Sequence, residues 1–174
     1  MLLSLRSGVG QTRLAALPEG QTRLEDTAPE GRKDDARPLS EEGVRRFRQV
    51  VKGLDRLEVR FSKLYHSPKL RAVQTADLLM KLVDGESEVM PALAEPPQEI
   101  LLAALAGFGK EDRVGMVGHE PWLSELCAWL VLGDRQKATA FILKKGGIAR
   151  LEGEPEPGKM QLLALLPPSV LRAI

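Results

Sequence analysis

The chain has 174 residues, with 25 lysine and arginine residues against 24 aspartate and glutamate residues, which gives a formal net charge of +1. This length is typical of a single domain. The even charge balance lacks the positive field with which nucleic-acid-binding proteins attract a polyanion. Hydrophobic residues make up 43% of the chain and aromatic residues only 4%, which predicts a packed core of leucine, alanine and valine. Nucleic acid is therefore not an expected partner.

Cysteine content and hydropathy narrow the class of protein further. The one cysteine, Cys127, excludes an internal disulfide and a thiolate metal cluster. No apolar stretch reaches the roughly 20 residues that cross a bilayer. The apolar start, residues 1–5, is too short for the hydrophobic region of a signal peptide. We expect a cytoplasmic protein with no membrane partner.

The first third of the chain divides into a strand, a long loop and a helix. Residues 1–5 form an apolar run that predicts a buried strand. Residues 9–37 are rich in glycine, proline and charged side chains, so we expect a mobile flap there. Ser40 then precedes an amphipathic pattern typical of an N-capped helix, with Val44, Phe47, Val50, Val51 and Leu54 on one face.

From residue 57 onward, apolar runs alternate with helical patterns. Strands are predicted over 57–65, 87–90, 113–117, 147–153 and 160–166, and helices from Ser67-Pro68 to Met80, over 98–108 and 120–132, and after Pro167-Pro168. This alternation implies right-handed crossovers and a mostly parallel sheet covered by helices. The sequence therefore predicts an α/β fold, a three-layer α/β/α sandwich, in one domain over 1–174.

Three of the predicted strands end in polar residues, at 6–8, 66–68 and 118–121. In an open parallel sheet such ends meet at one edge, where helix N-termini favour anions. Arg71 lies one turn into its helix, so its guanidinium can reach toward the same edge as Arg6 and His119. Two guanidinium groups with an imidazole suit a phosphoryl group, because planar forks match its oxygens. Singly, such residues are more often solvated charges or turn residues.

Five segments carry recognisable motifs: residues 34–43 (DDARPLSEEG), 67–76 (SPKLRAVQTA), 117–121 (VGHEP), 143–149 (LKKGGIA) and 165–172 (LLPPSVLR). In this order they resemble signatures of the histidine phosphatase superfamily, and more narrowly of its small phosphohistidine phosphatase branch. The second segment is the most specific of the five. The resemblance spans nearly the whole chain and implies a phosphoglycerate mutase-like fold.

In that family a strand-end Arg-His-Gly supplies a histidine that attacks phosphorus, while two arginines and a second histidine bind the phosphoryl oxygens. By position, Arg6, Arg71 and His119 match the arginines and the second histidine. The resemblance also places Gly8 and Ser67 in the phosphate-binding site. The nucleophile does not match, because the sequence reads Leu5-Arg6-Ser7-Gly8, with serine in place of the histidine.

The serine changes the expected chemistry. Imidazole is a neutral nucleophile near pH 7, whereas a hydroxyl needs a base to remove its proton. His119 is one candidate base and His66 another, although His66 also fits the pocket wall. Glu95 resembles the carboxylate that other branches use as leaving-group acid, and a plain surface glutamate is the competing interpretation. We expect slow turnover by the chain as it stands and restored activity in a Ser7→His variant.

By resemblance, the reaction is a hydrolysis that needs neither metal nor cofactor. We expect removal of a phosphoryl group from a phosphohistidine on a partner protein, or from a small phosphorylated molecule. A phosphate-binding pseudophosphatase, which recognises a phosphorylated protein without turnover, is the alternative that Ser7 favours. A mutase-like enzyme acting on sugar phosphates would need insertions, for which only residues 9–37 offer room.

Other features carry weaker predictions. Lys144 and Lys145 are placed at the mouth of the site or are simply solvated. Trp122 and Trp129 are seven residues apart on one predicted helix face, which indicates core packing, and Cys127 on the same helix is expected to be buried.

Overall fold

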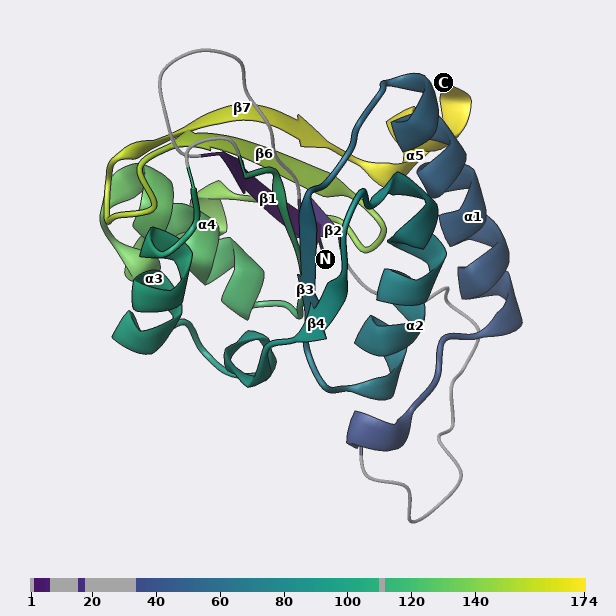
Figure 1. Cartoon of the computed structure of the whole chain (residues 1–174), viewed down its shortest axis with the longest axis horizontal. Coiled ribbons are helices and arrows are strands. Elements are labelled where there is room, and N and C mark those ends of the chain that lie inside the picture. Colours follow the sequence, from purple (N-terminus) through teal and green to yellow (C-terminus); the bar gives the residue numbers. More distant parts are fainter. Residues whose placement is uncertain (1, 7–15, 18–33, 110–111) are drawn as a thin grey trace.

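The computed structural model describes residues 2–6, 16–17, 34–109 and 112–174 (Figure 1). Within these ranges one sheet has the strand order β4-β3-β5-β1-β6-β7, and a short strand β2 also pairs with β5. The strands are β1 (Leu2–Arg6), β2 (Ala16–Leu17), β3 (Lys63–His66), β4 (Ser87–Val89), β5 (Val114–Val117), β6 (Ile148–Gly153) and β7 (Met160–Leu166).

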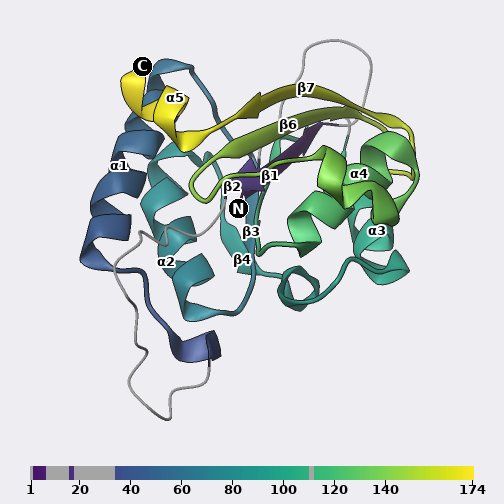
Figure 2. The same cartoon turned by 180° about the vertical axis from the view of Figure 1, so that it is seen from behind.

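Helices cover both faces of this sheet (Figures 1 and 2). The α-helices are α1 (Glu41–Arg56), α2 (Leu70–Leu79), α3 (Glu99–Ala106), α4 (Trp122–Leu132) and α5 (Pro168–Ala173). Short 3-10 turns are η1 (Asp34–Ala36), η2 (Met80–Leu82), η3 (Pro91–Ala94) and η4 (Arg135–Ala140). Helices α1, α2 and α5 lie on one face, and α3 and α4 lie on the other. The predicted three-layer α/β/α sandwich is confirmed. None of the helices in the described ranges is long and apolar enough to span a bilayer.

The direction of β1 is the main departure from the predicted sheet. Strands β2 and β3 each run parallel to β5, and β4 runs parallel to β3, as expected for crossover connections. Strand β1 instead runs antiparallel to β5, with Leu2 opposite Val117 and Leu5 opposite Val114. It runs parallel to β6, and β6 pairs antiparallel with β7. Parallel pairs still predominate in the sheet.

Helix α1 forms for the reasons that its sequence indicates. The Ser40 hydroxyl accepts a hydrogen bond from the Gly43 N–H at 3.0 Å, which caps the helix. Phe47, Val50 and Leu54 recur at helical spacing and are buried against the sheet. Each such side chain contributes about 1.5–3 kcal/mol on burial.

The strand predicted over 57–65 is shorter in the structure. Glu58 has a φ of 55°, in the left-handed region, and turns the chain out of α1. Phe61 makes only an isolated bridge to Val83, and regular pairing begins at Lys63. The apolar pattern before Lys63 therefore reflects burial of Phe61 rather than a continuous ladder.

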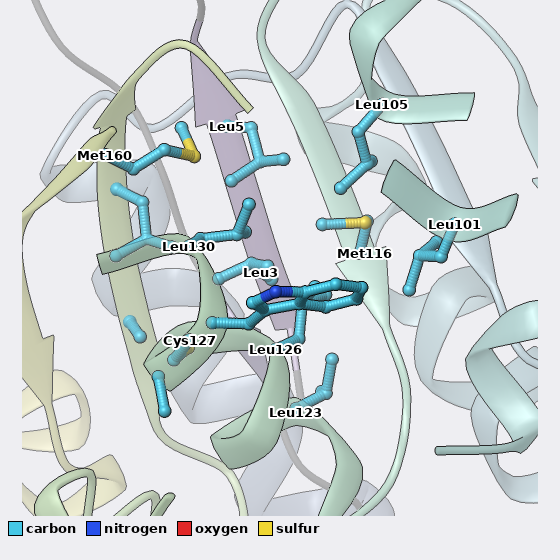
Figure 3. Packing of buried hydrophobic residues seen from close by; sticks show 14 of the residues in the cluster. Leu3, Leu5, Leu101, Leu105, Met116, Leu123, Leu126, Cys127, Leu130 and Met160 are labelled. Carbon is cyan, nitrogen blue, oxygen red and sulfur yellow. The ribbon is translucent and has the colours of Figure 1, made fainter. Parts of the chain in front are cut away.

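On the opposite face, α3 and α4 pack against β1 and β5 (Figure 3). Cys127 is buried there as predicted, and desolvation raises the pKa of its thiol. Trp129 is also buried, and the Arg135 guanidinium lies 4.7 Å from the centroid of its ring. The core prediction for these two residues is confirmed.

Candidate anion-binding site

Two neighbouring strand ends bring polar residues together. In the parallel pair of β3 and β5, His66 lies opposite Val117, so His66-Ser67 and Gly118-His119 leave the sheet side by side. Helix α2 begins at Leu70 and α4 at Trp122, directly after these strand ends. The prediction that these two strand ends share one edge is confirmed.

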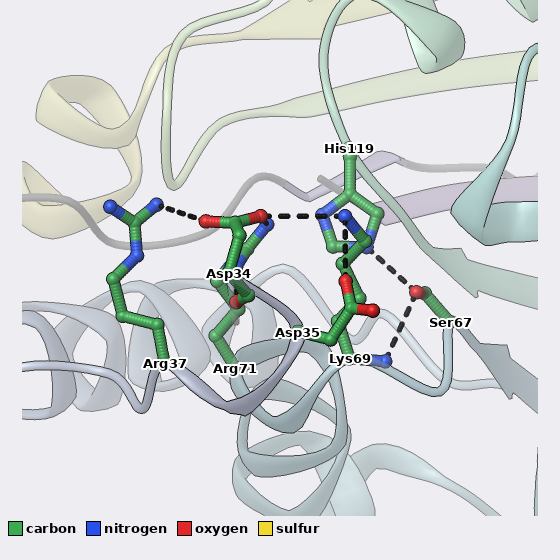
Figure 4. A network of polar contacts seen from close by, with 7 residues as sticks. All are labelled: Asp34, Asp35, Arg37, Ser67, Lys69, Arg71 and His119. Carbon is green, nitrogen blue, oxygen red and sulfur yellow. Dashed lines mark hydrogen bonds and ion pairs between the residues drawn. The ribbon is translucent and has the colours of Figure 1, made fainter. Parts of the chain in front are cut away.

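Arg71 is the buried cation of this edge. Its side chain is only 7% exposed, although it carries a charge. Its Nη1 donates a hydrogen bond to the Asp34 carbonyl oxygen at 2.6 Å, and its Nη2 donates to Asp34 Oδ2 at 2.8 Å (Figure 4). The hydrogen bond from Arg71 is the main reason that the pKa of Asp34 lies below its usual value. The guanidinium fork thus already holds an anionic group.

Further charges surround the Asp34 carboxylate. Lys69 Nζ lies 3.4 Å from Asp34 Oδ2 and 3.2 Å from Asp35 Oδ1. Arg37 Nη2 lies 3.2 Å from Asp34 Oδ1. Each contact is partly solvated and contributes little to stability alone. Together three cationic side chains meet two carboxylates, so the cluster is organised to hold anions.

His119 lies beside this cluster and is 6% exposed. Its Nε2 is 2.7 Å from the hydroxyl oxygen of Ser67, which also accepts a hydrogen bond from the Lys69 N–H at 3.3 Å. His66 Nδ1 donates to the Ser67 carbonyl oxygen at 3.0 Å. Ser67 itself is fully buried. The strand end at His66-Ser67 therefore supports the His119 ring rather than facing solvent.

Trp122 differs from its predicted role in the core. It is half-buried, and its ring centroid lies 6.1 Å from that of His119 in an edge-to-face arrangement. Lys69 Nζ lies 5.7 Å from the same ring. The first position of α4 points this side chain toward the strand ends, so Trp122 forms a wall of the site and only Trp129 belongs to the core.

Gly118 allows a close approach just before His119. A Cβ atom at this position would lie 3.2 Å from the Leu93 carbonyl oxygen and 3.3 Å from Leu123 Cδ2. Turn η3 therefore packs against the strand end, and Glu95 follows η3 as an exposed residue. Within the described residues Glu95 makes no hydrogen bond or ion pair with the Arg71 and His119 cluster. Its role as an acid stays a prediction.

The backbone of Arg6 lies at the other end of the sheet. Leu2, not Arg6, is opposite Val117, and Arg6 is opposite Glu152 of β6. Four residues of strand separate the Arg6 backbone from the edge with His119, a distance of about 13 Å. The prediction that all three strand ends share one edge is therefore wrong for β1. A short apolar strand can pair in either direction, so its hydrophobicity could not reveal this. Ser7 and Gly8 lie outside the described residues.

Lys144 and Lys145 lie at the edge that carries His119. Ile148 of β6 is opposite Leu2, which is opposite Val117, so the turn before β6 follows the same edge. Both lysine side chains are exposed. This backbone register agrees with the predicted placement of the two lysines at the mouth of the site.

Three contributors were not predicted as site residues from the sequence: Asp34, Lys69, and Trp122, which was assigned to the core. Asp34 belongs to the stretch 9–37 that was predicted as a mobile flap, yet residues 34–37 are tied to α2. The remainder of that stretch, apart from β2, lies outside the described residues. Two successive aspartates before an N-capped helix are a signal that could have suggested Asp34.

Comparisons with known proteins identify the class to which this site belongs. The sequence profile of the histidine phosphatase superfamily (branch 1) matches residues 20–96. An uncharacterized protein of Picosynechococcus sp. (strain ATCC 27264 / PCC 7002 / PR-6) is 34% identical over 124 residues, which are 68% of this chain and 73% of that protein. The chain belongs to the histidine phosphatase superfamily. The profile match includes Asp34 and Arg71 but begins after Ser7.

Solved structures show the same fold. The protein histidine phosphatase SixA complexed with tungstate superposes with a TM-score of 0.73 and is 22% identical, covering 95% of this chain and 97% of that chain. The phosphoserine phosphatase of Entamoeba histolytica in complex with 3-phosphoglyceric acid gives a TM-score of 0.63 at 16% identity, over 94% of this chain and 96% of that chain. The phosphoglycerate mutase-like fold that the sequence resemblance implies is thus confirmed.

Proposed function

We propose that this protein is a phosphatase that binds a phosphoryl group between Arg71 and His119 and removes it from a phosphohistidine on a partner protein. The observation that carries the proposal is the pair of hydrogen bonds from the Arg71 guanidinium to Asp34. A buried arginine whose two terminal nitrogens donate to a carboxylate oxygen and to the backbone carbonyl oxygen of the same residue can donate to phosphoryl oxygens in the same way.

The residues around Arg71 suit a compact dianion. His119 adds an imidazole beside the guanidinium, and Lys69 and the exposed pair of Lys144 and Lys145 add positive charge at the entrance. The leaving group of a phosphohistidine is an imidazole, so cleavage of its P–N bond demands little from a general acid. That agrees with the exposed position of Glu95. A small phosphorylated molecule is the other substrate class that this site would accept.

Binding without turnover is the second candidate. The contacts of the two histidines favour it. The chain has two histidines. His66 is buried with Nδ1 bonded to a backbone oxygen, and His119 has Nε2 against Ser67. The strand that precedes Ser7 ends at the far edge of the sheet. A pseudophosphatase would keep Arg71 and His119 for recognition and lack a dedicated nucleophile.

Two measurements on the full chain test the proposal. Calorimetric titration with inorganic phosphate should show binding, and Arg71→Ala should weaken it by about ten- to hundredfold, the range for a hydrogen bond to a charged group. Arg113→Ala is the matched control, because Arg113 pairs with Asp84 at the other end of β5. Equal phosphate affinity in Arg71→Ala and the unchanged chain would reject the site.

Turnover then separates the two candidates. Phosphorus NMR of a histidine-phosphorylated protein should show phosphate release that depends on Arg71. Phosphate binding without any release would support the pseudophosphatase instead.

A further inference from the structure

We infer that Ser67 is a positioning residue that fixes the neutral His119 ring as the tautomer with its proton on Nδ1. The hydroxyl oxygen of Ser67 lies 2.7 Å from His119 Nε2. Either atom of such a pair can donate, so the distance alone leaves the direction open. The other contacts of Ser67 decide it.

The hydroxyl of Ser67 has a limited number of hydrogen-bonding positions. It can accept two hydrogen bonds and donate one. The Lys69 N–H only donates, and it occupies one acceptor position at 3.3 Å. Ser67 is fully buried, so its hydroxyl proton cannot be directed to bulk water. That proton needs an acceptor within the protein.

His119 Nε2 is the acceptor within reach in the described part of the chain. If Nε2 carried a proton, the Ser67 oxygen would accept hydrogen bonds from two N–H groups, and its own proton would have no acceptor among the described residues. Buried donors without an acceptor are costly and rare in folded proteins. The favourable arrangement therefore has Ser67 donating to Nε2, which leaves the proton of the neutral ring on Nδ1.

His66 provides an internal comparison. Its Nδ1 lies 3.0 Å from the Ser67 carbonyl oxygen, and a carbonyl oxygen only accepts, so His66 also carries its proton on Nδ1. This contact uses the backbone of residue 67 and not its hydroxyl. Removal of the hydroxyl should thus change the tautomer of His119 and leave that of His66 unchanged.

The tautomer determines what His119 does at the anion site, and this step rests on the proposed function. With Nε2 accepting from Ser67, Nδ1 becomes the ring nitrogen that can donate to a phosphoryl oxygen. The edge-to-face contact with Trp122 holds the same ring from another side. His119 then acts as a neutral hydrogen-bond donor to the bound group rather than as a base through Nε2.

Nitrogen-15 NMR of the imidazole rings in the full chain tests the inference directly. The spectra are recorded at about pH 9, well above the ordinary pKa of a histidine side chain. A His66→Gln variant assigns the two sets of signals, because the chain has only two histidines. Both rings should show the pattern of the Nδ1–H tautomer. Observation of His119 as the Nε2–H tautomer would overturn the inference, and this result needs no serine variant.

Variants of Ser67 give the second readout. Ser67→Ala should move His119 toward the Nε2–H tautomer without affecting His66, and Ser67→Thr, which retains the hydroxyl, should restore Nδ1–H. Ser124→Ala is the matched control, since Ser124 is a buried serine whose hydroxyl contacts Glu120 Oε2 and the Phe141 carbonyl oxygen and not His119. A His119 signal that is identical in Ser67→Ala and the unchanged chain would contradict the inference.

Titration with inorganic phosphate separates this inference from the proposed function. Ser67→Ala should weaken phosphate binding by about three- to tenfold, the range for one neutral hydrogen bond. If phosphate binds to neither protein while the tautomers are as expected, the anion site fails and the role of Ser67 stands. If phosphate binds equally to both and His119 carries its proton on Nε2, the role of Ser67 fails and the anion site stands.

Discussion

Asp34 and Arg71 are 37 residues apart in the chain and are joined by two hydrogen bonds, one from each terminal nitrogen of the guanidinium. The two partners differ in exposure, because the Asp34 side chain is 53% exposed and that of Arg71 only 7%. The carboxylate therefore contacts the guanidinium from the solvent side, from which an external anion would also approach. Asp34 is therefore an internal competitor for the phosphoryl group that we propose Arg71 binds.

Removal of that competitor should strengthen anion binding. Asp34→Asn keeps a side chain of similar shape and deletes the negative charge, so phosphate should bind about two- to fivefold more tightly, in line with the worth of a partly exposed ion pair. Calorimetric titration measures the change. Asp84→Asn is the control, because Asp84 pairs with Arg113 at the opposite edge of the sheet. Weaker phosphate binding by Asp34→Asn would show that Asp34 serves the ligand rather than competes with it.

The same carboxylate gives stability a defined dependence on pH. The pKa of Asp34 lies below its ordinary value of 3.8 in the folded protein, mainly because of the hydrogen bond from Arg71. A depressed pKa stabilises the fold above the unfolded value, and this stabilisation is lost as the pH falls below about 4 toward the lower folded pKa. Solvent screening limits the effect to under about 1 kcal/mol.

Denaturant unfolding between pH 5 and pH 2 measures this contribution. The free energy of unfolding of Asp34→Asn should fall less steeply with acid than that of the unchanged chain. Parallel curves for the two proteins would show that the Asp34 pair does not persist in solution.

Substitution at position 7 tests the direction of β1. The family resemblance predicts that Ser7→His restores a nucleophile. Position 7 directly follows Arg6, whose backbone lies opposite Glu152 at the far edge of the sheet. We now expect Ser7→His to leave the rate of hydrolysis of a phosphohistidine protein unchanged, with no acid-labile phosphate trapped on the variant. A rise of several orders of magnitude, the usual scale for a missing nucleophile, would indicate that β1 runs parallel to β5 in solution.

Gly53 provides a stability prediction that opposes helix propensity. Alanine within a helix is favoured over glycine by about 1 kcal/mol. A Cβ on Gly53, however, would clash with the Leu171 carbonyl oxygen of α5, so the two helices would have to separate. Gly53→Ala should therefore lower the free energy of unfolding by about 1–3 kcal/mol.

Gly107→Ala is the control for that substitution, because its Cβ would meet only the Ala104 carbonyl oxygen at 3.4 Å. Thermal and denaturant unfolding should show little change for this variant. A Gly53→Ala protein as stable as the unchanged chain would mean that α5 does not dock against α1 in solution.

Local patterns were sufficient for much of the architecture. The apolar period of α1 and its Ser40 cap depend on residues that are close together in the chain. The apolar pattern around Cys127 on α4 was likewise enough to predict that this residue is buried. The two strand ends at Ser67 and His119 were also predictable, since crossover connections force parallel strands to end at one edge.

The sequence by itself thus determined the layers, the family signatures and the two strand ends that carry Ser67 and His119. Only the tertiary structure decided the direction of β1, the grip of Asp34 on Arg71, and the place of Trp122 against His119 instead of the core. The physical reason is the range of the interactions. Periodicity and capping act between near neighbours in the chain, whereas strand direction and ion pairing join residues that meet only when the whole sheet has formed.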